Sequence, residues 1–327
     1  MDASSKENLP PPPGLIASLA AGFDTTASHA SVILLPILLD LFLWLGPHLR
    51  IEALLRPMMT VFQSLPPSQE ATLTEQIMRQ FAQDFNLLSL IRTLPIGIPS
   101  LLAGTLPVTN PFGNVIWVEF KDPLQFFNWW VMLTLLGWVG GGLYYNWISS
   151  VTRKNGSSSS LRQTARAIWQ TIVLSLLWIF IALAIGIPVM MLLGTLALIS
   201  PSLAQFALLL GLFFFLWTLP AIFFSAHGIF TYEQNALTSI QSSLRMVRFT
   251  LPASGLFILS AFLISQGLDF LWRVPPTDSW MTLIGITGHA FISSALLAAS
   301  FVYYRNVNTW LRLVLEKFNT QATSARA

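Results

Sequence analysis

The stretch Ile168–Leu198 reads IWQTIVLSLLWIFIALAIGIPVMMLLGTLAL and contains no Asp, Glu, Lys or Arg. About 20 mostly apolar helical residues cross the hydrocarbon core of a bilayer, so this stretch is long enough for one span. Its excess length and the Gly186-Ile187-Pro188 triplet predict a tilted or kinked helix. The stretch therefore predicts a transmembrane helix.

The composition of the whole chain agrees with this stretch. Of 327 residues, 9% are charged and 54% are hydrophobic, and the mean hydropathy is +0.65. Soluble domains carry roughly 25% charged residues, so a soluble globule of this size could not cover its surface. The chain is also too hydrophobic to be disordered. Composition thus predicts a multi-pass membrane protein.

Six stretches are apolar and long enough to span. The first is the shortest and contains Pro36 and Asp40. The predicted fold class is an all-α polytopic transmembrane helix bundle with these six spans: Ser28–Leu45, Phe127–Ile148, Ile168–Leu198, Leu203–Phe224, Leu251–Trp272 and Trp280–Tyr304.

The regions outside the spans divide the chain further. Residues 1–27 are predicted to be an N-terminal segment with an interfacial helix at Leu15–Ala30, 28–45 the first span, and 46–126 an extracytoplasmic connection. Residues 127–305 form a five-span bundle, and 306–327 a tail. Met1–Pro13 has no basic region followed by a short apolar stretch, so no cleaved signal peptide is expected.

The long connection contains two distinct segments. Ser68–Leu94 has apolar residues at helical spacing and predicts an amphipathic helix. Thr93–Gly104 is apolar but broken by Pro and Gly. Irregular backbone at membrane depth must be buried in protein. This segment, within residues 85–106, therefore either re-enters the membrane or lies as a loop on its surface, and the sequence leaves both open.

Basic residues in the connections predict the orientation. Eleven Lys and Arg lie on the side of the N-terminus, the second-to-third connection, the fourth-to-fifth connection and the tail, against six on the other side. Loops rich in Lys and Arg stay in the cytoplasm. Both termini are therefore predicted to be cytoplasmic, in the cell membrane. Anionic inner-leaflet lipid is the expected partner, contacted by Arg162, Arg166, Arg245 and Arg248 on amphipathic helices.

Catalytic signatures were sought as well. The chain has no Cys, which excludes thiol catalysis and iron–sulfur clusters. Neither a G-x-x-x-x-G-K-[ST] loop nor an H-E-x-x-H motif is present. Gly140-Gly141-Gly142 lies inside a span, where small residues favour close packing. We therefore predict no enzymatic activity, no cofactor and no metal.

Ionisable residues inside spans are candidates for function because burying them in a membrane is costly. Three qualify: Asp40, Asp269 and His289. At a rise of about 1.5 Å per residue, all three lie in the outer half of the bundle. The sequence thus predicts a polar cluster there. The alternative is that each carboxylate caps a helix or faces water.

Two connections predicted to be cytoplasmic share the four-residue sequence SSLR, at Ser159-Ser160-Leu161-Arg162 and at Ser242-Ser243-Leu244-Arg245. The second lies in EQNALTSIQSSL (Glu233–Leu244), which a span, Pro275-Pro276 and a last span ending Tyr303-Tyr304-Arg305 follow. This arrangement, over about residues 160–312, resembles the polytopic membrane domain attached to some glycerophosphoryl diester phosphodiesterases and found alone in bacterial membrane proteins. The aromatic residue and Lys-Gly pair that this family often carries are missing here. The resemblance implies a helical membrane domain without the soluble catalytic barrel.

These observations predict a non-enzymatic integral membrane protein that acts in envelope maintenance or membrane-complex assembly. Its partners would be membrane lipids and protein subunits, including further copies of itself, and not nucleic acid. The alternative function is a transporter or channel for a small solute or lipid, which would need polar groups converging on broken helices near the midplane.

Overall fold

The computed structural model describes residues 12–64, 69–103, 109–153 and 160–324. The chain is 80% helical, which confirms the all-α prediction. The helices are α1 Leu15–Ser28, α2 Leu34–Leu45, α3 Glu52–Gln63, α4 Gln69–Asp84, α5 Pro123–Val151, α6 Leu161–Ile199, α7 Pro201–Phe224, α8 His227–Tyr232, α9 Ala236–Trp272 and α10 Thr282–Ser324. Two 3-10 turns, η1 Ala30–Ile33 and η2 Leu87–Ile91, and four short strands complete the order.

Six crossings of a membrane fit these helices. Within the described ranges, five helices are long and apolar enough to span: α5, α6, α7 with α8, α9 and α10. The sixth candidate is the pair formed by α1 and η1–α2, bent by 93° at their junction. The first predicted span is thus the second arm of a broken helix. The predicted bundle of membrane-spanning helices is confirmed.

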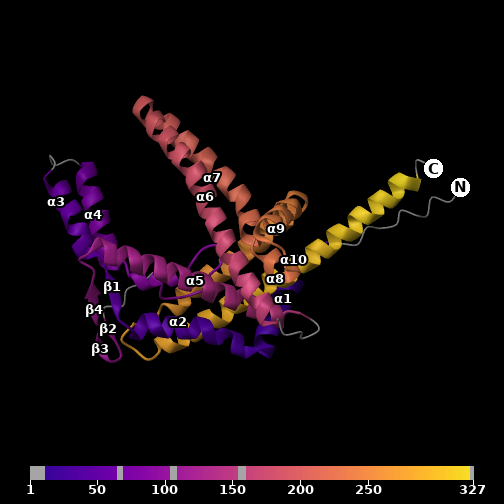
Figure 1. The fold of residues 1–327 in the computed structure, drawn as a ribbon, viewed down its shortest axis with the longest axis horizontal. Coiled ribbons are helices and arrows are strands. Elements are labelled where there is room, and N and C mark those ends of the chain that lie inside the picture. The colour runs from indigo at the N-terminus through magenta and orange to yellow at the C-terminus, as the bar shows by residue number, and fades with distance from the viewer. Residues whose placement is uncertain (1–11, 65–68, 104–108, 154–159, 325–327) are drawn as a thin grey trace.

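The broken helix packs on α10, which runs along the longest axis of the molecule (Figure 1). One face of α1 carries Ser18, Gly22 and Thr26, all buried, at every fourth position. A Cβ at Gly22 would lie 2.4 Å from the carbonyl oxygen of Ala295 and 2.5 Å from Ala299. Small residues at this spacing let two helix backbones approach closely. The helix predicted to lie in the membrane interface therefore has one face buried in the bundle.

The helix α9 contains both a connection and a span. Thr250 has non-helical backbone angles (φ −128°, ψ 20°), and Pro252 follows it. Proline has no backbone N–H to donate to the preceding turn, and its ring clashes with that turn, so it bends a helix. The predicted span Leu251–Trp272 is thus the second half of α9, after the kink. The helix α10 begins at Thr282 and continues past Tyr304 to Ser324, so the predicted tail is largely helical.

The long connection forms a cap over one end of the bundle. Strand β1 (His48–Arg50) pairs in parallel with β4 (Trp117–Glu119), and β2 (Thr109–Asn110) pairs with β3 (Gly113–Asn114). The predicted amphipathic helix corresponds to α4, which pairs with α3 in a projecting hairpin (Figure 1). In β1, His48 is buried and its Nε2 lies 3.0 Å from the carbonyl oxygen of Leu43. Burial, aided by Arg50, lowers the pKa of this imidazole.

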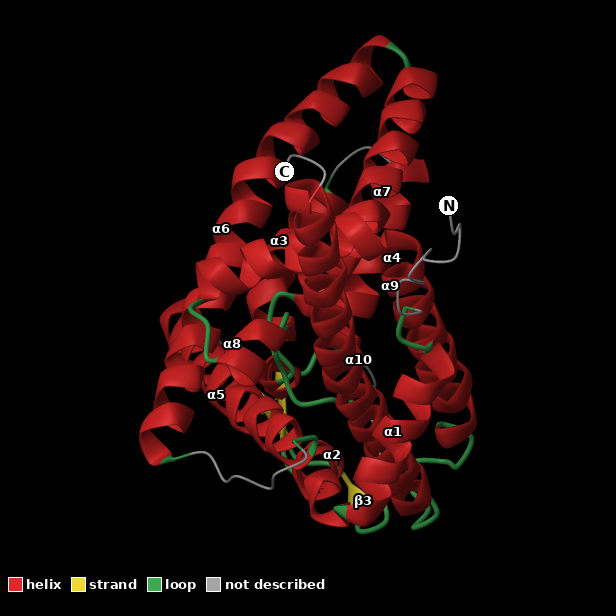
Figure 2. Ribbon diagram, turned by 90° about the vertical axis from the view of Figure 1, so that its right-hand side faces the viewer, coloured by secondary structure: helices red, strands yellow, loops and turns green. Residues whose placement is uncertain are grey.

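The helices α6 and α7 form a hairpin that rises away from the other spans (Figures 1 and 2). Only 11% of the most apolar stretch of each is buried inside the protein, against 56% for α10. A capping box between Ser160 and Gln163 begins α6. Pro201 begins α7 in the first helical turn. The first turn of each helix is therefore stabilised by its own sequence. Most side chains of the two helices are exposed on the surface of the protein.

Candidate intramembrane polar site

Asp40 lies on α2 and is fully buried. Its carboxylate accepts hydrogen bonds from the hydroxyl of Ser100 (2.5 Å) and from the backbone N–H groups of Leu101 (3.0 Å) and Leu102 (3.1 Å). Ser100 Oγ in turn accepts from the N–H of Ala103. Hydrogen bonds to an ionised group are stronger than neutral ones, and a buried charge needs them. The carboxylate therefore holds the irregular segment that follows η2, here called the 93–103 segment.

The same segment and the end of η2 pack closely against glycines of α5. A Cβ at Gly137 would lie 2.6 Å from the carbonyl oxygen of Ile91, and one at Gly141 would lie 2.8 Å from Cα of Gly97. Ile96 and Leu101 of the segment are buried. The close-packing interpretation of the glycine run is thus confirmed, although its main neighbour is irregular backbone and not a helix. Both alternatives for this segment, re-entry into the membrane or a loop on its surface, stay open.

An arginine also binds the 93–103 segment. Arg273, the residue that ends α9, donates a hydrogen bond to the carbonyl oxygen of Leu101 (3.1 Å). Asp40 therefore binds the N–H groups at this turn of the 93–103 segment, and Arg273 binds a C=O group. Buried backbone polar groups need such partners because no water replaces them.

Asp269 and His289 form a pair between α9 and α10. Asp269 Oδ1 lies 2.7 Å from His289 Nδ1, and both side chains are largely buried. Ser293 Oγ donates to the backbone carbonyl of His289. Nε2 of His289 is buried and has no hydrogen-bond partner among the described residues.

The structure brings two of the three predicted residues into contact, Asp269 and His289. Asp40 binds the 93–103 segment instead. In the described ranges, no three His, Asp or Glu side chains converge closely enough to hold a metal ion. A carboxylate and an imidazole at this distance can share or transfer a proton. Proton binding is the chemistry that the arrangement allows.

Further buried polar side chains continue from this region along α10. Tyr144 Oη lies 2.8 Å from Ser294 Oγ, and His227 Nε2 lies 2.8 Å from Ser300 Oγ. These residues were missed in the sequence analysis. A signal exists for part of this set: His289 and Ser300 share one face of α10, and polar residues on one face of a mostly apolar helix predict buried hydrogen bonds. Ser294, which pairs with Tyr144, lies on a different face.

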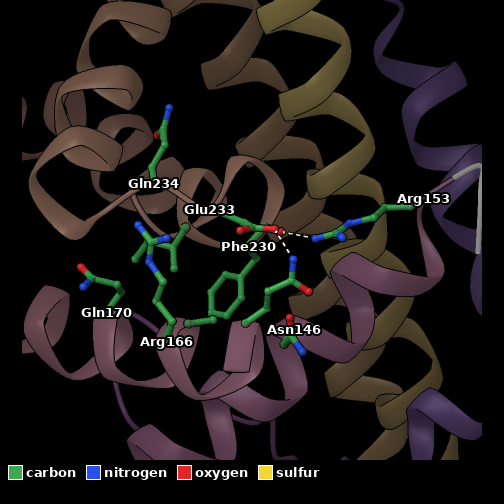
Figure 3. A pocket seen from close by; sticks show the side chains of 10 residues that line it. Asn146, Arg153, Arg166, Gln170, Phe230, Glu233 and Gln234 are labelled. Atoms are coloured by element: carbon green, nitrogen blue, oxygen red, sulfur yellow. Dashed lines mark hydrogen bonds between the residues drawn. The ribbon is translucent and has the colours of Figure 1, made fainter. Parts of the chain in front are cut away.

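The opposite end of the bundle has a narrow cleft (Figure 3). Arg153 donates to the carbonyl oxygen of Phe230 (2.7 Å), and Gln163 donates to Glu233 (2.9 Å). Gln170 accepts from the N–H of Ala236 (2.8 Å). The space is about 20 Å³, enough for about one water molecule. The hydrogen bonds across the cleft therefore connect α5 and α6 to the segment that leads into α9. The space is too small for a substrate.

Comparison with protein-family models, with curated proteins and with solved structures finds no match for this chain.

The four arginines predicted to contact lipid are all exposed. Arg166 lines the narrow cleft in Figure 3, while Arg162 lies in the first turn of α6. Arg245 lines a separate groove between α9 and α10, and Arg248 lies about one helical turn further along α9. Their placement leaves the guanidinium groups available to an anionic surface. Lipid contact itself stays a prediction.

Proposed function

We propose that the protein is a non-catalytic integral membrane protein that assembles with another membrane-spanning chain through the α6–α7 hairpin. The low burial of this hairpin is the observation that carries the proposal. Gly186, Gly194 and Gly211 have open space where a side chain would be. Lipid covers apolar side chains as well as protein does, but small residues favour close approach of another helix.

The orientation belongs to the same proposal. Leu15 at the start of α1 and Leu311 near the end of α10 pack against the same hydrophobic cluster. The start of α1 and the part of α10 around Leu311 therefore lie on one side of the bundle. Together with the excess of basic residues in the connections on that side, this supports cytoplasmic termini in the cell membrane.

A photo-crosslinking amino acid at Phe213, whose side chain is 70% exposed, is expected to give discrete protein adducts in intact membranes. The physical reason is that the hairpin is covered by another helix and not by mobile lipid alone. The measurement is a mass shift on denaturing gels, followed by identification of the adduct by mass spectrometry.

The matched control is the same crosslinker at Phe262, which is also exposed but lies on α9. Equal adducts at both positions would indicate random collision. Lipid adducts alone at Phe213 would contradict assembly through the hairpin.

A second function, transport coupled to proton movement, is favoured by the Asp269–His289 pair beside a broken span. Intramembrane ionisable pairs mark proton relays in many pumps and transporters. Binding sites of such proteins also form where spanning helices are interrupted. Here η1 interrupts the span between α1 and α2, and Asp40 of α2 binds the irregular 93–103 segment.

Proteoliposomes with an entrapped pH dye are expected to acidify under an imposed proton gradient with the wild-type protein. His289→Gln should reduce this flux by at least about tenfold, because an amide does not bind a proton near neutral pH. His29→Gln, outside the site and exposed, is the matched control. Equal flux for the two variants, or no flux above empty liposomes, would exclude this function.

A further inference from the structure

A groove of about 270 Å³ lies between the first half of α9 and the extension of α10 beyond Tyr304. It approaches the roughly 300 Å³ at which small-molecule pockets begin. Its walls differ in character. Arg245 and Ser242 of α9 and Arg312 of α10 provide polar groups, whereas Phe249 and Leu315 provide an apolar surface. A groove with one charged and one apolar wall fits an amphipathic ligand.

The charged wall is purely cationic. Arg245 and Arg312 come from different helices, and no Asp or Glu is among the lining residues. The Arg312 guanidinium lies 5.6 Å from the ring centroid of Tyr232, which also lines the groove. Two guanidinium groups without a carboxylate partner in the groove match a phosphate, which they can bind with paired hydrogen bonds.

The apolar wall lies where the span of α9 begins. Phe249, 57% exposed, directly precedes the kink at Thr250, after which α9 continues as a membrane span. Met246 beneath it is buried in the core and receives a contact from Asn308, whose amide also binds the carbonyl oxygen of Tyr304. The groove floor is therefore fixed. Its position next to the start of a span places the arginines at headgroup level and Phe249 toward the acyl chains.

We propose that this groove binds one anionic phospholipid, with its phosphate between Arg245 and Arg312 and an acyl chain against Phe249. The hydroxyl of Ser242, which has no hydrogen-bond partner in the described part of the chain, donates to the phosphate. This site is independent of the proposed role of the α6–α7 hairpin, which lies on other helices. The proposal adds Arg312 to the residues predicted to contact lipid. It also distinguishes Arg245, which lines the groove, from Arg248, which does not.

The test is lipid binding to the purified full chain in detergent, followed by native mass spectrometry during titration with phosphatidylglycerol. A cation beside anionic lipid contributes about fivefold to binding, so R245Q/R312Q should weaken binding by about 25-fold. The matched control is R56Q/R79Q, which removes the same charge from exposed residues of α3 and α4, outside the groove and outside the arginines predicted to contact lipid, and should change binding less than twofold. Equal loss in both double variants, or none in either, would overturn the proposal.

The lipid must also be distinguished from free phosphate. Glycerol 3-phosphate carries the headgroup chemistry without acyl chains and should bind at least tenfold more weakly than phosphatidylglycerol. Phe249→Ala should weaken binding of the lipid but leave glycerol 3-phosphate binding unchanged. If glycerol 3-phosphate binds as tightly as the lipid, the site is a soluble-phosphate site and the proposal is wrong. Circular dichroism and gel filtration of each variant confirm that it is folded.

Discussion

Replacing Asp40 with leucine is expected to lower the free energy of unfolding by about 3–6 kcal/mol, since three buried donors lose their acceptor. These donors are the Ser100 hydroxyl and the N–H groups of Leu101 and Leu102. Each unsatisfied buried polar group costs roughly 1–3 kcal/mol, and no water in the hydrocarbon core compensates for it. The loss should appear as a lower midpoint of thermal unfolding in detergent.

A local measurement separates release of the 93–103 segment from general instability. The natural chain has no Cys, so a single Ile98→Cys, at a buried position, reports exposure of this segment to a maleimide reagent. Labelling should be slow in the otherwise natural chain and fast when Asp40→Leu is added. Asp24→Leu is the matched control, because Asp24 is exposed on α1. Slow labelling and an unchanged unfolding midpoint in Asp40→Leu would show that the carboxylate does not hold the segment.

Gly22→Leu is expected to separate α1 from α10. A Cβ at this position would lie within 2.5 Å of the backbone N of Ala299 and closer still to the carbonyl oxygen of Ala295. Backbone atoms of a regular helix cannot move aside as a flexible side chain can. Overpacking a core typically costs about 1–3 kcal/mol, and displacing a whole helix face costs more. We therefore expect a loss of about 3 kcal/mol or more in the free energy of unfolding.

The measurement is again maleimide labelling of a cysteine, placed at a buried position on the same face of α1. Ser18→Cys is almost fully buried in the folded chain and should react with a maleimide only when Gly22→Leu is present. Gly267→Leu on α9 is the matched control, because a Cβ there meets nothing within 4 Å. It should leave stability unchanged or raise it slightly through helix propensity. If both leucine variants behave alike, the fit between α1 and α10 contributes little.

The sequence predicts the spans well because a bilayer requires long apolar stretches and the chain has few charges to interrupt them. The exact helix ends follow from packing instead. The half of α9 before Thr250 and the extension of α10 past Tyr304 are too polar to register as spans. The helix α3 was not predicted, since Pro57 lies inside it and its polar residues give no membrane signal.

For the candidate site, depth along each helix and the adjacency of the last two spans predicted that Asp269 and His289 lie together, as they do. The contacts of the 93–103 segment could not be predicted in the same way. Ser100 lies 60 residues from Asp40, on irregular backbone whose course follows from the glycines of α5. Arg273 looked like an ordinary residue of an outer loop, and its bond to Leu101 depends on where that segment sits. The resemblance to a phosphodiesterase-associated membrane domain stays a prediction, since no comparison tests it.

The contact of α1 with α10 joins the beginning of the chain to its end, since Gly22 and Ala299 are 277 residues apart. A ribosome that adds about 5–20 residues per second needs roughly 14–55 seconds to make that interval. During this time the small-residue face of α1 lacks the helix that finally covers it. A nascent chain that stops before Thr282 never acquires that helix. Synthesis of α10 is therefore a condition for closing the bundle, and chains truncated before it would display a small-residue face to quality-control proteases.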